Sequence, residues 1–219
     1  MRNRDVIKRF LRSRRRRIHK RGHGIHSPFL FSLITGVIDN KHRYYFYDQI
    51  DLMYKEVTKA SKSYKMNNSK NLGVPSVKVL QCIFRIINEF QPKRIFFEGE
   101  FGDFYYRLFK GVSSEIEILP FDRYSEFADE VCSMEESDNK NSNIVFCNVS
   151  EVDNRISLIQ SIRENDIVIC NGLQWNKHDK NNWSTYLLNT NITASLESKE
   201  MGIGFANSKL HKQNFFIKY

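Results

Sequence analysis

The stretch FFEGEFGDFYYRLF, residues 96 to 109, decides the fold class. It starts with the end of an apolar run, passes through a turn that contains Gly99 and Gly102, and continues in a helical pattern of aromatic residues. A strand, a glycine turn and a helix form the usual cradle for a nucleotide-like cofactor. Because Glu98 and Glu100 also stand in this turn, the sequence raises the question of whether the loop still binds a cofactor.

The segments around this stretch alternate between helical and strand-like patterns. Apolar residues at helical spacing predict helices at 77–87 and 156–163. Short β-branched runs predict strands at 94–97, 116–119, 143–149 and 166–172. Three further strand-like runs, at 191–197, 201–207 and 214–219, have no helix between them. We therefore expect an α/β fold with a mainly parallel sheet, covered on both faces, and antiparallel strands at its C-terminal end.

The N-terminal third has a different composition, and we divide the chain into a basic helical extension, 1–73, and an α/β domain, 74–219. Residues 1–21 contain 11 of the 34 Lys and Arg residues and one of the 25 acids. The formal net charge is therefore +10 in this segment and −1 in the remainder. Ser27 as N-cap and Pro28 after it predict the start of an apolar helix that runs to about residue 38. A second helix is predicted at 47–62.

The four cysteines indicate a reducing compartment. None belongs to a Cys-x-x-Cys pair or has a histidine at metal-ligand spacing, so we expect no metal site. Cys147 and Cys170 lie in apolar runs, where a free cysteine is usually a small core residue. The apolar run 27–38 is much shorter than the ~20 residues that a membrane span needs. We therefore predict a cytoplasmic protein.

Five segments carry a resemblance to a known family: RGHGIHSPFLFSLI (21–34), YYFYDQID (44–51), PKRIFFEGEFG (92–102), LQWNKHDKNNW (173–183) and MGIGF (201–205). In this order they resemble a group of bacterial class I S-adenosylmethionine-dependent methyltransferase-like proteins with a basic, helical N-terminal extension. HGIHSPF is the most specific of the matching pieces. The resemblance implies a Rossmann-like sheet of seven strands that ends in an antiparallel strand pair. Because 132–143 is too short for a full strand and helix, we expect one strand of that sheet to be missing or reduced.

The resemblance also implies where S-adenosylmethionine would bind. The family's glycine turn has the form Glu-x-Gly-x-x-x-Gly, which Glu98, Gly99 and Gly102 match only in part. The acid that binds the ribose hydroxyls should follow the second strand, but Pro120 stands there and Asp122 comes two residues late. Our candidate cofactor-binding residues are the matching ones, Glu98, Gly99, Gly102 and Asp122.

Acids are also missing at the ends of the later strands. Where the family carries carboxylates, this chain has Cys147 and Asn148 after one strand and Asn171, Gly172 and Gln174 after the next. Asparagine keeps the shape of aspartate but cannot supply its charge. We therefore expect weak or lost cofactor binding, which makes the chain a weakly active or non-catalytic pseudoenzyme with no assignable catalytic residue. The other reading is an active methyltransferase of unknown substrate.

The basic arm suggests a second function. Arg12 and the run Arg14, Arg15, Arg16 and Arg17 can neutralise phosphates without reading base sequence. Tyr44, Tyr45 and Tyr47 would extend such a surface by stacking on bases. We expect RNA or another polyanion as the partner of residues 1–21. An arm that packs its apolar side on its own domain, with the arginines in water, is an equally weighted alternative. A polybasic helix on an anionic membrane is a less favoured one.

Overall fold

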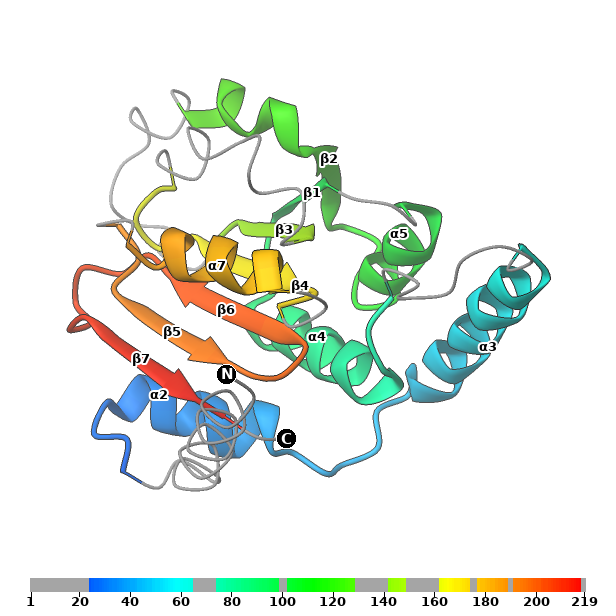
Figure 1. Cartoon of the computed structure of the whole chain (residues 1–219), viewed down its shortest axis with the longest axis horizontal. Helices are drawn as coiled ribbons and strands as arrows, with labels where there is room; N and C mark the ends of the chain where they lie inside the picture. The colour runs from blue at the N-terminus through cyan, green and yellow to red at the C-terminus, as the bar shows by residue number, and fades with distance from the viewer. Residues whose placement is uncertain are drawn as a thin grey trace, which may run out of the picture.

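The chain folds as an α/β protein with one seven-stranded sheet between helices (Figure 1). The computed structural model describes residues 24–64, 74–98, 102–128, 142–148, 162–173, 177–188 and 191–217. The helices are α2 (Pro28–Ser32), the π-helix η2 (Leu33–Ile38), α3 (Tyr47–Tyr64), α4 (Val77–Phe90), α5 (Gly102–Lys110), η3 (Phe121–Tyr124), η4 (Glu126–Ala128) and α7 (Lys177–Tyr186). The strands are β1 (Arg94–Glu98), β2 (Glu117–Pro120), β3 (Ile144–Asn148), β4 (Ile167–Asn171), β5 (Ala194–Glu197), β6 (Met201–Phe205) and β7 (Gln213–Phe216).

The strand order is β2-β1-β3-β4-β6-β5-β7, and only β6 runs against its two neighbours. The four strands from β2 to β4 are parallel, which confirms the expected mainly parallel sheet. The prediction that every C-terminal strand is antiparallel to its neighbour is wrong for β7, because β7 pairs with β5 in parallel. Strands β6 and β7 do run in opposite directions, but β5 lies between them, so they cannot form a hairpin pair.

Along the chain, the described residues contain no strand after β2 and before β3. In the sheet, β2 is the edge strand next to β1. A reduced strand was expected in this part of the chain. Most of the corresponding segment, residues 129–141, lies outside the described residues, as do residues 156–161 of the predicted helix at 156–163. The sheet nevertheless has seven strands, since β7 adds one at the opposite edge.

Alternation of side chains along the strands builds two separate apolar cores. On one face, Ile95, Phe146 and Ile169 pack with α2, η2, α4 and α5. On the other face, Phe96 and Val168 belong to a cluster with η3 and α7. Figure 1 shows α7 on one side of the sheet and α4 on the other. This two-sided burial explains why the strands read as continuous apolar runs instead of alternating ones.

The N-terminal helices belong to the first of these cores. Ser27 caps α2 as expected, since its side chain accepts a hydrogen bond of 3.4 Å from the Leu30 amide and Pro28 follows it. The predicted single helix to residue 38 is instead a short α-helix followed by a π-helix. Ile34, Ile50 and Ile86 share one cluster with the sheet. The domain boundary at 73/74 stays a prediction, but described residues on both sides of it are packed together.

A buried arginine on α4 holds these helices in place. Arg85 is 7% exposed and donates hydrogen bonds to the carbonyl oxygens of Val37 and Ile38, at 2.6 and 2.8 Å, and to the hydroxyl of Tyr47, at 2.6 Å. The two carbonyls end the π-helix, where a cation is favourable. Arg85 therefore joins η2, α3 and α4 with three bonds from one planar group.

Candidate cofactor edge

The carboxyl ends of the parallel strands meet at one edge of the sheet. Glu98 of β1 is level with Cys147 of β3, and Asn148 is level with Asn171 of β4. The chain adds β2 on one side of β1 and then β3 on the other side, so the strand order reverses next to β1. In open α/β sheets, ligands bind at such a switch point. The edge therefore brings together the strand ends at which the family would present its acids.

A buried tyrosine–asparagine pair occupies the end of β4. The side-chain amide of Asn171 donates a hydrogen bond of 2.9 Å to the hydroxyl of Tyr105 on α5, and neither residue is exposed. Burial raises the pKa of the Tyr105 hydroxyl. The side chain of Asn171 is therefore buried between α5 and the sheet. A ligand-binding acid at this position would instead have to face solvent.

Aromatic rings fill the space between α5 and the sheet next to this pair. The ring of Tyr105 lies 4.8 Å from that of Phe146 and 5.3 Å from that of Phe97, and Phe109 packs on both Tyr105 and Phe146. Tyr105, Phe109 and Phe146 are fully buried. Tyr105 thus extends a ring cluster up to the carboxyl edge, and its hydroxyl is the polar end of that cluster.

The candidate cofactor residues are only partly brought together. Gly102 is the first residue of α5, and a Cβ added there would meet only the Phe97 ring at 3.7 Å, so space does not require glycine at this position. Asp122 is exposed in η3, where the chain after β2 turns towards the other face of the sheet. Gly99 and the side chain of Glu98 lie outside the described residues.

A shallow hollow of about 390 Å³ lies between α5 and the edge strand β2. Its lining is mostly apolar and includes Phe97, Tyr106, Ile118 and Pro120, with Asp103 as the one acid among the described residues that form it. Gly102 and the end of β2 meet here, but Asp122 does not line the hollow. Among the described residues that line the hollow, no acid follows β2 in the place of a ribose-binding acid.

The turn between β5 and β6 closes the end of β4 from the other side. The carbonyl of Glu200 accepts hydrogen bonds from the amides of Gly172 and Leu173, at 2.8 and 3.4 Å. Its carboxylate accepts bonds of 2.9 and 3.3 Å from the amide and hydroxyl of Ser76, which stands before α4. The amides of Gly172 and Leu173, which follow β4 directly, are therefore already hydrogen-bonded within the protein. Neither Tyr105 nor Glu200 was predicted from the sequence, because their partners Asn171 and Ser76 lie 66 and 124 positions away along the chain.

Two cysteines lie beside this edge on the α7 face. The sulfur atoms of Cys147 and Cys170 are 3.4 Å apart and both residues are buried, which confirms their prediction as core residues. The hydrogen bond with Cys147 and burial raise the pKa of the Cys170 thiol. Within the described residues, no three His, Cys, Asp or Glu side chains are grouped as metal ligands would be.

The predicted stacking surface is smaller than the sequence suggested. Tyr47 is buried and binds Arg85, so it is not available to a base, and Tyr44 is half-buried against the rings of Tyr47 and Phe84. Tyr45 is 72% exposed, and its hydroxyl donates to the carbonyl of Gly111 at 2.7 Å. The five arginines of the arm lie outside the described residues. Of the helices in the described part of the chain, none is long and apolar enough to cross a membrane.

A buried acid stands at the opposite edge of the sheet, just before β4. Asp166 is 3% exposed and accepts hydrogen bonds from the hydroxyl of Tyr124 and, at 3.2 and 3.3 Å, from the backbone and side-chain amides of Asn143. Burial outweighs these bonds and raises the pKa of the Asp166 carboxyl above its ordinary value. The folded protein therefore holds this proton more tightly than the unfolded chain does.

The Asp166→Asn variant should show this linkage. Since the folded-state pKa is raised, the wild-type protein loses stability as the pH rises from about 4, the ordinary value for Asp, through the folded value. The variant has no carboxyl to ionise, so the difference in unfolding free energy should move in its favour as the pH rises. Urea unfolding of both proteins between pH 4 and pH 8 measures this. A difference that stays constant with pH would contradict it.

The chain matches no protein-family model and no curated protein.

Proposed function

We propose that the protein is a pseudoenzyme: a methyltransferase-like α/β protein with a degraded S-adenosylmethionine site that is weakly active or non-catalytic. The observation that carries this proposal is the buried pair of Asn171 and Tyr105 at the end of β4. An active site of the expected kind needs solvent-facing acids at the strand ends. Here the strand end is neutral, buried and bonded to a helix.

The chemistry of the cofactor makes this loss important. S-adenosylmethionine carries a positive sulfonium and two ribose hydroxyls, which carboxylates bind best. The amides of Asn148 and Asn171 supply no charge to such a ligand. Of the acids that the structure describes near this edge, Asp103 and Asp122 are exposed, and the carboxylate of Glu200 is bound by Ser76. The residues present therefore do not fit the cofactor.

Binding of S-adenosylmethionine tests the proposal. We expect a dissociation constant no tighter than about 1 mM, which corresponds to roughly −4 kcal/mol. If a cofactor does bind, Glu98, Gly99, Gly102 and Asp122 are the residues that would hold it.

The charge distribution favours a second candidate function, binding of RNA or another polyanion through the arm. A net charge of +10 lies in residues 1–21, whereas the rest of the chain is near neutral at −1. Such a segment binds phosphates mainly by releasing counterions, so sequence preference should be slight. This role needs no chemistry at the sheet edge and is compatible with a lost cofactor site.

Replacing Arg14, Arg15, Arg16 and Arg17 together by alanine should weaken the salt dependence of nucleic-acid binding. On a duplex, the log–log slope is about −0.9 per phosphate contacted, so the loss of four arginines should flatten it by about three to four units. Fluorescence anisotropy with a generic RNA or DNA at several salt concentrations measures the slope.

The matched control replaces four exposed lysines of the described body, namely Lys55, Lys78, Lys199 and Lys209. It removes the same charge but should change the slope by less than about one unit. An equal effect of both variants would show that net charge acts, not the arm. A large fall in melting temperature of the arginine variant would instead show that the arm packs on its own domain.

A further inference from the structure

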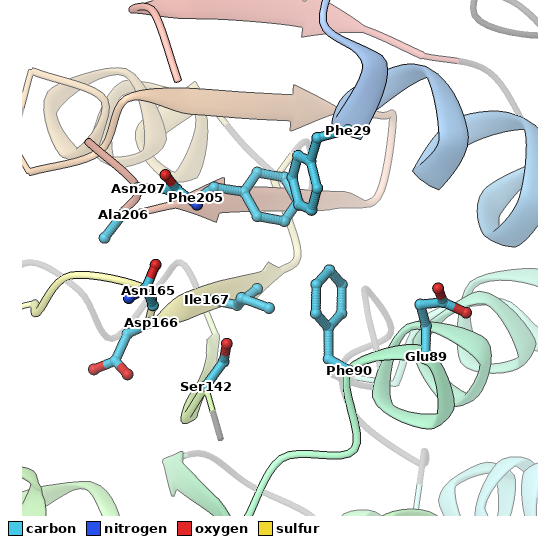
Figure 2. A pocket seen from close by; sticks show the side chains of 10 residues that line it. All are labelled: Phe29, Glu89, Phe90, Ser142, Asn165, Asp166, Ile167, Phe205, Ala206 and Asn207. Carbon is cyan, nitrogen blue, oxygen red and sulfur yellow. The ribbon is translucent and has the colours of Figure 1, made fainter. Parts of the chain in front are cut away.

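A second cavity lies at the edge of the sheet opposite the candidate cofactor site. It has a volume of about 310 Å³ and is formed by the end of α4, the start of α2, the residues before β4 and the end of β6. Figure 2 shows aromatic rings on one side of it and the polar side chains of Asn165 and Asn207 on the other. Nothing in the proposed function uses this place.

The aromatic side of the cavity consists of three phenylalanines from three different elements. The ring of Phe29 lies 5.4 Å from that of Phe205, and the ring of Phe90 lies 6.3 Å from each of them. Phe29 and Phe90 are only half-buried, so parts of both rings remain open. The faces of such rings carry negative charge density and attract cations.

Among the described residues that line the cavity, the one exposed charged side chain is acidic. Glu89 is exposed at its rim in the last turn of α4, a turn that carries the negative end of the helix dipole and contains no Lys or Arg. Asp166 also lines the cavity, but its carboxyl is bound by Tyr124 and Asn143 and points away from the three rings (Figure 2). None of the described residues that line the cavity is Lys or Arg.

We propose that this cavity binds a small organic cation: an ammonium group attached to an aromatic or apolar body. The body would pack on Phe29, Phe90 and Phe205, and the ammonium would pair with Glu89 beside the negative end of α4. A bare metal ion fits less well, because the described residues offer no group of three acidic, histidine or cysteine ligands. An anion would face the Glu89 carboxylate and a helix C-terminus together.

Three probes of similar shape test the proposal: phenethylamine, which is a cation at pH 7, 2-phenylethanol, which is neutral, and phenylacetate, which is an anion. Their binding to the full chain is measured by ligand-observed NMR titration. The amine should bind at least about tenfold more tightly than the alcohol, and the anion more weakly than either. Equal binding of amine and alcohol, or an amine dissociation constant weaker than about 10 mM, would overturn the proposal.

Two variants locate the binding. Glu89→Gln should weaken binding of the amine about tenfold and leave the alcohol unchanged, whereas Glu115→Gln, an equal charge change at an exposed acid outside the cavity, should alter neither. Phe90→Leu keeps apolar volume but removes a ring, so it should weaken binding of the amine about two- to fivefold. Full binding of the amine by Glu89→Gln, or an equal loss in Glu115→Gln, would show that the cation binds elsewhere.

Discussion

Replacing Arg85 by methionine is expected to lower the free energy of unfolding by about 3–5 kcal/mol. The substitution keeps much of the side chain's apolar length but removes three hydrogen bonds, of 2.6, 2.8 and 2.6 Å. The carbonyls of Val37 and Ile38 and the hydroxyl of Tyr47 would lose their partner in a buried place. Each buried group left without a partner costs about 1–3 kcal/mol. Chemical denaturation with global fitting measures the loss.

Arg107→Met is the matched control. Arg107 also stands on a helix, but it is 42% exposed by side chain and pairs with Glu56 at 3.1 Å in solvent. An exposed ion pair is worth about 0–1 kcal/mol, so this variant should unfold close to wild type. Arg85→Lys should also be strongly destabilised, because an ammonium cannot reproduce the planar fork. If Arg85→Met lost less than about 1 kcal/mol, Arg85 would not hold η2, α3 and α4 together.

Replacing Gly202 by alanine should have the next largest effect, a loss of about 2–3 kcal/mol. Gly202 lies in the middle of the sheet on β6, and α7 lays Trp183 directly on it. An added Cβ would stand 2.5 Å from the Trp183 ring, and that ring is 2% exposed and stacked on Tyr186 at 5.2 Å. Since the ring cannot move into solvent without losing its burial, the sheet and α7 must separate. Thermal unfolding should show a fall of roughly 4–12 °C for a domain of this size.

A double-mutant cycle and a control glycine separate this clash from a general effect of alanine. Trp183→Phe alone should be destabilising, but in the Gly202→Ala background the smaller ring relieves the clash, so the combined loss should fall short of the sum by about 1 kcal/mol or more. Gly36→Ala meets nothing within 4 Å and should be neutral or slightly stabilising. Strict additivity of the two losses would contradict a direct contact as the cause.

Local pattern was enough to predict most of the sheet. The runs at 143–149 and 166–172 became β3 and β4 because continuous β-branched stretches between turn residues suit a strand buried on both faces. Ser27 and Pro28 marked the start of α2 because a capped helix start depends on adjacent residues. The parallel pairing of β7 with β5 was not predictable. The order of strands along the chain does not show that β5 lies between β6 and β7 in the sheet.

The candidate site was harder to predict than the fold. At the ends of β3 and β4, where the resemblance implies acids, the sequence shows Asn148 and Asn171. The partners that occupy the edge were not visible in the sequence, because Tyr105 is 66 positions from Asn171 and Glu200 is 124 positions from Ser76. Such contacts arise only when α4, α5 and the β5–β6 turn are packed on the sheet. The sequence therefore indicated that the strand ends are uncharged. It did not indicate that Tyr105 and Glu200 occupy the carboxyl edge of the sheet.

Calorimetric titration with S-adenosylmethionine and with its demethylated product tests the central claim most directly. The two ligands share the ribose and adenine, and only the first carries the sulfonium charge, so the pair also reports whether any acid still acts at the edge of the sheet. With Asn171 bonded to Tyr105, both ligands should bind no tighter than about 1 mM, or roughly −4 kcal/mol. A micromolar dissociation constant for either ligand, about −8 kcal/mol, would contradict the pseudoenzyme and show a working cofactor site.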